Sequence, residues 1–213
     1  MKLFGKIDLD DIHKTLIVLS LVFGVSALFM PLVIIFIAQD LLFHSREHWY
    51  FGTPGEAYLI AGVGMLTVPA VTLLYFLLSK WKSAIVNSNW FISFVLLAVM
   101  ITGIPFYHLG IHTYFFLDDD GVHQNELRDT SLYTLEWEDV AYFVPELRSD
   151  DGLGAYETYH FISRDQQIVS IPFNTDIIQL RSRFISLIEE GDGEILRPMS
   201  PEEFKEWKES RDM

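Results

Sequence analysis

The chain of 213 residues is long enough for one ordinary domain, or for a small domain joined to something else. Half of its residues are hydrophobic, yet 29 Asp and Glu residues against 15 Lys and Arg residues give a net charge of −14. A protein this acidic lacks the basic face that phosphate neutralisation requires, which excludes a nucleic-acid binder. The absence of cysteine excludes disulfide frameworks, cysteine zinc sites, iron–sulfur clusters and cysteine nucleophiles.

The charge is distributed unevenly along the chain. Residues 1–117 hold six basic and six acidic residues, whereas residues 118–213 hold nine basic and 23 acidic residues. The whole net charge therefore lies in the C-terminal part. This distribution predicts an apolar membrane region over residues 1–112 and an acidic soluble domain over residues 113–213.

Three long segments without Asp, Glu, Lys or Arg predict transmembrane helices at about residues 15–38, 57–79 and 90–111. A helix of about 20 apolar residues crosses the hydrocarbon core. The first segment is too long for the apolar region of a signal peptide, which has about 7–15 residues, so we expect a retained helix. Trp and Tyr residues near the segment ends suit the headgroup level of a bilayer.

The predicted spans contain features of close helix packing. Pro31 lies deep in the first span and should kink it, because proline removes a backbone hydrogen bond. Gly62 and Gly64, with Ala61 and Ala70 nearby, predict a small-residue face for helix contact. Transporters and proton pumps usually place ionisable groups at mid-membrane, so the uncharged spans argue against those classes.

Basic residues in the short loops predict the orientation of the protein. Positively charged loops stay in the cytoplasm. Five basic residues lie in the N-terminal segment and in the loop after the second span: Lys2, Lys6, Lys14, Lys80 and Lys82. The opposite side has Arg46 and Arg128 alone. The N-terminus is therefore predicted to be cytoplasmic, and the domain over residues 113–213 extracytoplasmic.

After residue 111 the pattern changes to alternation of apolar and polar residues, which predicts β-strands separated by turns. The turns begin at Asp118-Asp119-Asp120-Gly121 and Ser149-Asp150-Asp151-Gly152, where glycine suits positive φ. The predicted strands are residues 114–117, 122–127, 133–137, 140–144, 156–163 and 167–173.

Two helices are predicted after the strands. The first is capped by Asn174 or Thr175, carries an apolar stripe and stops at Gly191. The second opens at Ser200-Pro201-Glu202-Glu203, which combines a capping box with proline at the first helical position. Its residues Phe204 and Trp207 are predicted to dock it onto the domain or the bilayer surface.

The strand order carries a resemblance to a known family. Asp120-Gly121-Val122, followed by the run from Tyr133 to Val140, resembles the bacterial pleckstrin-homology-like (PH-like) domains of small integral membrane proteins. The resemblance covers residues 113–190. It implies an α+β chain, in which three transmembrane helices precede an antiparallel β-barrel or sandwich capped by a C-terminal helix. The family has no assigned activity, and its domains are often cytoplasmic, which conflicts with the loop charges.

The fold suggests binding of a lipid headgroup, but the residues oppose it. Phosphoinositide-binding PH domains place basic side chains around the first hairpin turn, whereas Asp118, Asp119 and Asp120 occupy that turn here. Carboxylates repel an anionic leaflet, so we expect no phosphoinositide headgroup as a ligand. Contact with other proteins remains, either through an open sheet edge or through the groove beside the helix.

Four histidines form two pairs at helical spacing. His44 and His48 lie before the second span, and His108 and His112 lie at the end of the third. Side chains at i and i+4 share a helix face and can ligate one metal ion, and two crossings would place both pairs on one side of the membrane. The four imidazoles suit zinc, copper or nickel. Amphipathic histidines at the membrane interface are the alternative interpretation.

No catalytic signature is present in the sequence. It lacks a helical His-Glu-x-x-His, a glycine-rich phosphate loop and Gly-x-Ser-x-Gly, and its paired carboxylates suit solvated turns and helix ends. His123 and His160 fall on predicted strands, where structural histidines are expected. The main hypothesis is therefore a non-enzymatic accessory or scaffold protein without a cofactor. The alternative is a membrane protein that binds or handles a divalent metal at the four paired histidines.

Overall fold

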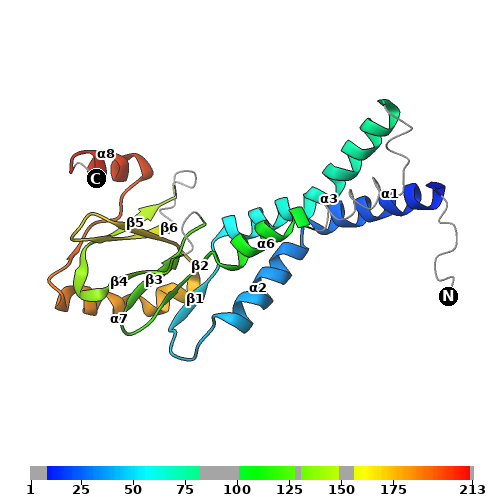
Figure 1. Ribbon diagram of the computed structural model, residues 1–213. Helices are drawn as coiled ribbons and strands as arrows, with labels where there is room; N and C mark the ends of the chain where they lie inside the picture. Colours follow the sequence, from blue (N-terminus) through cyan, green and yellow to red (C-terminus); the bar gives the residue numbers. More distant parts are fainter. Residues whose placement is uncertain (1–8, 82–100, 128–130, 149–155, 212–213) are drawn as a thin grey trace. The chain divides into compact units, whose positions relative to one another are not determined.

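The computed structural model describes residues 9–81, 101–127, 131–148 and 156–211 (Figure 1). The chain forms two compact units. The helical unit consists of Met1–Leu42 and Gly55–His112, and the sheet unit consists of Phe43–Pro54 and Thr113–Met213. The sheet unit therefore begins where the sequence divides the chain, but it also takes in the 43–54 segment.

The helical unit contains α1 (Leu9–Ser26), α2 (Met30–Leu42), α3 (Gly55–Trp81) and α6 (Ile104–Ile111). The first predicted span is not one helix, because α1 and α2 meet at an angle of 68°. The break lies just before Met30 and Pro31, the first residues of α2. In a continuous helix a proline ring would clash with the carbonyl four residues earlier, but proline is tolerated in the first turn of a new helix. Pro69 lies inside α3 without breaking it.

Fewer helices have the length and apolarity of a membrane span than the three predicted. Among the described residues, α3 passes alone, over Gly55–Leu78, and the bent pair of α1 and α2 is a second span if the two cross together. Of the three predicted spans, the described residues therefore contain one or two. Residues 90–100 of the third predicted span lie outside the described residues, and α6 represents its end.

Glycines bring α6 close to α3. A Cβ atom on Gly103 would lie 3.2 Å from the carbonyl oxygen of Gly64, and one on Gly110 would lie 2.8 Å from that of Ala57. The start of α6 thus lies beside the middle of α3, and its end beside the start of α3, so the two helices are antiparallel. The predicted small-residue face is confirmed at Gly64, but Ala70 is exposed.

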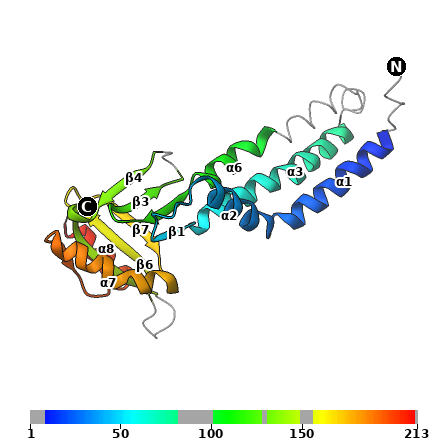
Figure 2. The ribbon, with the colours of Figure 1, turned by 90° about the horizontal axis from the view of Figure 1, so that it is seen from below.

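The helix α1 also runs antiparallel to α3 (Figure 2). At one end, His13 Nε2 lies 2.9 Å from the hydroxyl oxygen of Tyr75. At the other end, a Cβ atom on Gly62 would lie 3.4 Å from the carbonyl oxygen of Ala27. The start of α1 and the end of α3 are therefore at the same end of the helical unit.

The described residues of the sheet unit form two four-stranded sheets. The first has the order β1 (Tyr50–Gly52), β2 (Tyr114–Leu117), β3 (Gly121–Asn125), β4 (Tyr133–Glu136). The second has the order β7 (Ile168–Pro172), β6 (Tyr156–Ser163), β5 (Val140–Leu147), β8 (Glu194–Ile195). Pairing is antiparallel except between β5 and β8. The described strands do not close into one barrel, so the barrel alternative is wrong.

The predicted core is confirmed. A single cluster of buried residues contains Leu135, Trp137, Ile171 and Phe184. The short 3₁₀ helix η1 (Trp137–Asp139) follows β4, and α7 (Thr175–Glu190) covers the cluster with Ile177, Phe184 and Ile188.

Both predicted helix caps of the sheet unit are present. Asn174 Oδ1 accepts hydrogen bonds from the backbone N–H groups of Asp176 and Ile177 at the start of α7. Ser200 and Glu203 form the capping box of α8 (Pro201–Glu209). Phe204 and Trp207 of α8 pack against a smaller cluster on the second sheet, around Val144 and Ile162.

The 43–54 segment is an integral part of the first sheet, which the sequence did not predict. The backbone N–H of Trp49 donates to the carbonyl oxygen of Leu117 at 2.7 Å, and β1 pairs with β2. Asn174 Nδ2 donates to the hydroxyl oxygen of Tyr50. On the other face of the sheet, Phe43 stacks on Tyr114 at 4.5 Å between ring centroids. The sheet unit is therefore assembled from two separate stretches of the chain.

Candidate functional site

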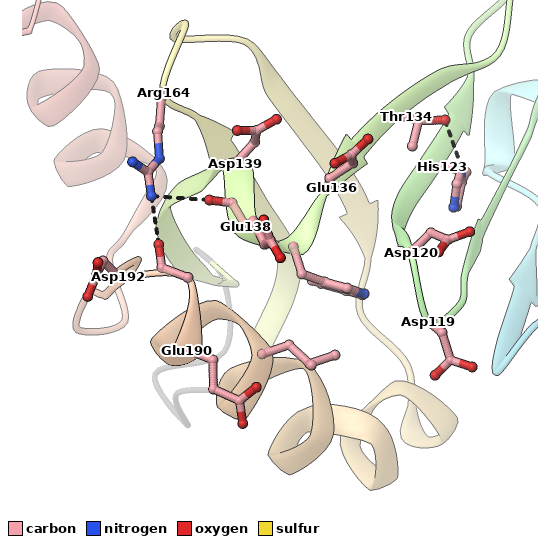
Figure 3. A pocket seen from close by; sticks show the side chains of 13 residues that line it. Asp119, Asp120, His123, Thr134, Glu136, Glu138, Asp139, Arg164, Glu190 and Asp192 are labelled. Carbon is pink, nitrogen blue, oxygen red and sulfur yellow. Dashed lines mark hydrogen bonds between the residues drawn. The ribbon is translucent and has the colours of Figure 1, made fainter.

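An acidic groove opens on the surface of the sheet unit (Figure 3). Its volume is about 1160 Å³. It lies between the turn from β2 to β3, η1 and the C-terminal end of α7. Its lining consists of Asp119, Asp120, His123, Thr134, Glu136, Trp137, Glu138, Asp139, Arg164, Leu187, Glu190, Gly191 and Asp192.

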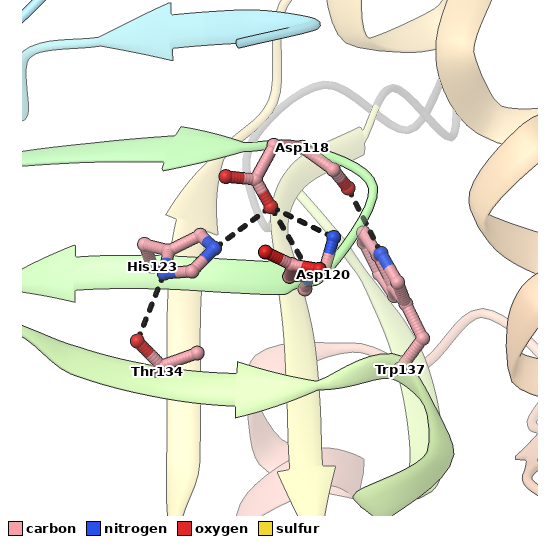
Figure 4. Close-up of polar contacts among 6 residues, drawn as sticks. Asp118, Asp120, His123, Thr134 and Trp137 are labelled. Atoms are coloured by element: carbon pink, nitrogen blue, oxygen red, sulfur yellow. Dashed lines mark hydrogen bonds and ion pairs between the residues drawn. The ribbon is translucent and has the colours of Figure 1, made fainter. Parts of the chain in front are cut away.

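Asp118 organises the turn at one side of the groove (Figure 4). Its Oδ1 accepts hydrogen bonds from the backbone N–H groups of Asp120 at 3.0 Å and Gly121 at 3.2 Å, and lies 2.8 Å from His123 Nε2. His123 Nδ1 lies 2.9 Å from Thr134 Oγ1. The indole N–H of Trp137 donates to the Asp118 carbonyl oxygen at 3.0 Å. Asp118 therefore holds the turn that carries Asp119 and Asp120.

The same contacts determine the charge of Asp118. Burial alone would raise the pKa of its carboxyl group, but the hydrogen bond and the charge of His123 lower that pKa. The backbone N–H groups of Asp120 and Gly121 lower it further, and the net result is a pKa below 3.8. The carboxylate is therefore ionised at neutral pH, as its role as an acceptor requires.

Gly121 is required by close approach of the backbone rather than by the positive φ that the sequence suggested. A Cβ atom at this position would lie 2.2 Å from the carbonyl oxygen of Leu135. The described non-glycine residues with positive φ are Gln166, at 65°, and Asp192, at 61°. Asp192 lines the groove just after α7.

Arg164 joins the two walls at the other side of the groove (Figure 3). Its Nη2 donates to the carbonyl oxygens of Glu138 at 3.2 Å and Gly191 at 2.7 Å. The C-terminal end of a helix carries a partial negative charge, so the end of α7 at Gly191 also favours a cation. Arg164 fixes η1 against this helix end.

The lining of the groove is strongly negative. Seven of its residues are carboxylates, namely Asp119, Asp120, Glu136, Glu138, Asp139, Glu190 and Asp192. Among the described lining residues, Arg164 is the one permanent cation, and its guanidinium group already bonds two carbonyl groups. The groove is therefore suited to a cationic partner.

No pattern in the sequence predicts this groove. The carboxylates come from the turn after β2, from β4 and η1, and from the end of α7. Each group has the local appearance of a solvated turn or helix end. The excess of acidic residues after residue 118 was the available signal, and it carries no information about which of them meet in space.

The four candidate metal ligands divide between the two units, with His44 and His48 in the sheet unit and His108 and His112 in the helical unit. The His44 and His48 rings lie edge-on, with centroids 6.2 Å apart, and those of His108 and His112 stack at 4.2 Å. Within the described residues, no group of three or more His, Asp or Glu side chains is arranged to hold a metal. Metal binding by these histidines stays a prediction.

His48 is enclosed by aromatic rings. It stacks on Phe116, with centroids 4.0 Å apart, and lies parallel to Phe51 at 6.0 Å. Burial lowers its pKa, and nearby Asp118 opposes that effect in part. Ring packing thus accounts for this side chain without a metal ion.

His123 and His160 have the structural roles that were predicted for them. His123 bonds Asp118 and Thr134, as described above. His160 Nε2 lies 3.1 Å from Glu146 Oε2, and its Nδ1 lies 2.8 Å from Ser170 Oγ. Its ring stacks on Phe204 of α8, with centroids 4.1 Å apart. The polar atoms of both rings therefore have partners within the sheet unit.

No family model, curated protein sequence or solved structure matches this chain.

Proposed function

We propose that this chain is a multi-pass integral membrane protein that displays a PH-like domain for contact with other proteins. Its role is that of a non-enzymatic accessory or scaffold protein. The acidic groove is the contact surface, and a basic segment of the partner is its ligand. The observation that carries the proposal is the lining of one groove, whose described residues include seven carboxylates and a single, already bonded cation.

The surface of the helical unit supports the membrane assignment. Large hydrophobic side chains are exposed along α1, α2 and α3, for example Leu21 at 68%, Phe36 at 62% and Leu59 at 73%. Water would penalise so large an apolar surface, whereas lipid would cover it.

The connectivity of the chain supports an even number of crossings between residues 55 and 112. The 43–54 segment and residues 113–213 form one folded unit, so both lie on the same side of any membrane. A chain that leaves through α3 must return before residue 113. The antiparallel packing of α6 on α3 is the arrangement that a returning segment would have. These observations support three spans in total, when the bent pair of α1 and α2 is counted as the first.

The order of the elements supports a PH-like domain. Antiparallel strands β2 to β7 are followed by the amphipathic helix α7, which covers the core. The predicted strands over residues 114–117 and 156–163 coincide with β2 and β6. Two adjacent sheets in place of a closed barrel leave strand edges for further contacts.

The ends of the helical unit support one orientation. His13 contacts Tyr75, so the start of α1 and the end of α3 share one end. Five basic residues lie near these two helix ends in the sequence, namely Lys2, Lys6, Lys14, Lys80 and Lys82. The positive-inside rule therefore favours a cytoplasmic N-terminus and an extracytoplasmic sheet unit.

A binding measurement with the full-length protein tests the proposed contact surface. The protein is held in nanodiscs of zwitterionic lipid, and binding of a fluorescent octa-lysine peptide is followed by anisotropy at about 0.15 M salt. Glu136, Glu138 and Glu190 are exposed in the groove, so their replacement by Gln should weaken binding at least tenfold.

A matched triple variant controls for net charge. Glu202, Glu206 and Glu209 are exposed on α8 and lie outside the groove lining, and their replacement by Gln removes the same charge. If both triple variants weaken binding equally, overall charge governs the interaction and the groove assignment fails.

A further inference from the structure

Arg183 of α7 shows how a guanidinium group binds at the margin of the acidic groove. Its Cζ atom lies 3.6 Å from the centroid of a Trp49 ring, and its Nη2 donates to Asp119 Oδ1 at 2.7 Å. A planar cation over an indole ring, with a carboxylate at its edge, satisfies both the stacking and the hydrogen-bonding capacity of arginine. Lysine has a compact ammonium group and cannot stack in this way.

The two residues that hold Arg183, Trp49 and Asp119, form what we call the arginine seat. The seat adjoins the groove, because Asp119 is one of the lining residues. Trp49 stacks on Trp137, another lining residue, with ring planes 6° apart and centroids 5.9 Å apart. Trp137 in turn stacks on the buried ring of Phe184. The aromatic part of the seat is therefore fixed by the core of the sheet unit.

Arg183 is held in the seat by exposed contacts. The side chain of Arg183 is 51% exposed and that of Asp119 is 80% exposed. Water competes strongly for ion pairs and cation–π contacts at such positions, so each stabilises the occupied seat only weakly. A guanidinium group from another molecule can therefore replace Arg183 at small cost, particularly when the rest of its chain is attracted by the groove.

We propose that the arginine seat binds an arginine of the partner's basic segment, and that Arg183 occupies the seat as an internal competitor in the free protein. This inference rests on the proposed function, because the groove must first attract a basic segment. It adds a preference for arginine over lysine at one position. It also gives the 43–54 segment a role in recognition, since that segment supplies Trp49.

The test compares two peptides of equal charge on the full-length protein in zwitterionic nanodiscs. The probes are fluorescent octa-arginine and octa-lysine, and the readout is the Kd of each. Arg183→Ala empties the seat. Arg197→Ala is the matched control, because Arg197 is also exposed and pairs with Glu203 at 2.9 Å, away from the groove lining.

We expect Arg183→Ala to tighten octa-arginine binding by roughly 3–10-fold relative to Arg197→Ala, with a clearly smaller gain for octa-lysine. Arg183→Lys keeps the charge but stacks poorly, so it should give an intermediate gain for octa-arginine. This conservative variant preserves the test if Arg183→Ala impairs folding.

The possible outcomes separate the inference from the function on which it rests. If both peptides bind, and Arg183→Ala and Arg197→Ala tighten them equally, long-range charge explains the effect and the arginine seat is refuted while the groove remains. If neither peptide binds to any of these proteins, the proposed function fails and the seat with it.

Discussion

The ring of Trp49 lies parallel to the ring of Trp137, with planes 6° apart and centroids 5.9 Å apart. Trp49 comes from the segment between α2 and α3, whereas Trp137 begins η1 after β4. A residue between two helices of the apolar half is thus packed against the core of the acidic half. The stability of the sheet unit must therefore depend on residues outside 113–213.

Replacement of Trp49 by Ala should lower the free energy of unfolding of the sheet unit by about 2–3 kcal/mol. This is below the usual cost for a fully buried Trp, because Trp49 is partly exposed. Hydrogen exchange of the amides in β2 and β3 of the full-length protein measures the loss. Leu132→Ala, at a residue that is 46% exposed, should change stability by less than about 0.5 kcal/mol. Equal protection in the two variants would contradict the prediction.

Gly121→Ala should destabilise the turn beside the groove by about 1–3 kcal/mol. The new methyl group would lie 2.2 Å from the carbonyl oxygen of Leu135, so the backbone of β4 must move. Gly55→Ala provides the control, since no atom lies within 4 Å of a Cβ at that position. Thermal unfolding of both variants measures the difference. The close approach would be refuted if Gly121→Ala melts together with Gly55→Ala.

Strands β2 to β7 were predictable because each has a local pattern. The alternation over residues 156–163 and the flanking turns specify β6, and Asn174 before an apolar stripe specifies the start of α7. The strand β1 has no comparable signal. Its neighbourhood, Trp49-Tyr50-Phe51, matches the aromatic residues expected at a membrane interface. The same rings serve in a domain core, and only their partners in β2 and η1 distinguish the two roles.

The break of the first predicted span was partly predictable. Pro31 indicated a kink, but the length of an uncharged segment does not show whether a kinked helix stays continuous. The bend between α1 and α2 is 68°, and both helices contact α3, an arrangement that the local sequence does not specify. The acidic groove depends likewise on tertiary contacts, because Asp119, Glu138 and Glu190 are far apart in the chain.

The sheet unit should lose stability as the pH falls below about 6.5, in part because of His160. Burial lowers the pKa of His160 from 6.5, although Glu146 opposes the effect. Below pH 6.5 the unfolded chain therefore binds more protons at this residue than the folded one, so acid favours unfolding. His160→Gln should flatten the dependence of the melting temperature on pH between about 5 and 7. An unchanged slope would exclude His160 as a contributor.

The topology can be tested with single cysteines, because the chain has none of its own. Asp165 is exposed on the turn between β6 and β7. Asp165→Cys should react with a membrane-impermeant maleimide on intact cells, and Lys2→Cys should react only after permeabilisation. The opposite pattern would place the sheet unit in the cytoplasm and overturn the orientation derived from the basic loops.

Metal analysis distinguishes the alternative function. A metal-handling protein should retain zinc or copper in stoichiometric amount after purification, and His44→Ala with His108→Ala should abolish it. The proposed interaction function predicts less than about 0.1 equivalent of either metal, because ring contacts within each pair account for these side chains without a metal ion. Stoichiometric metal that depends on these residues would favour the alternative.

The assembly of the sheet unit from two stretches of chain has a consequence for biosynthesis. The ribosome makes β1 before α3 and α6, and β2 only after them. In the proposed topology, β1 stays unpaired at the membrane surface until the chain has crossed the bilayer and returned. A nascent chain that misses one crossing would leave β1 and β2 on opposite sides of the bilayer, unable to pair. In that topology, folding of the sheet unit would depend on correct insertion, and misinserted chains would present an open sheet to cellular proteases.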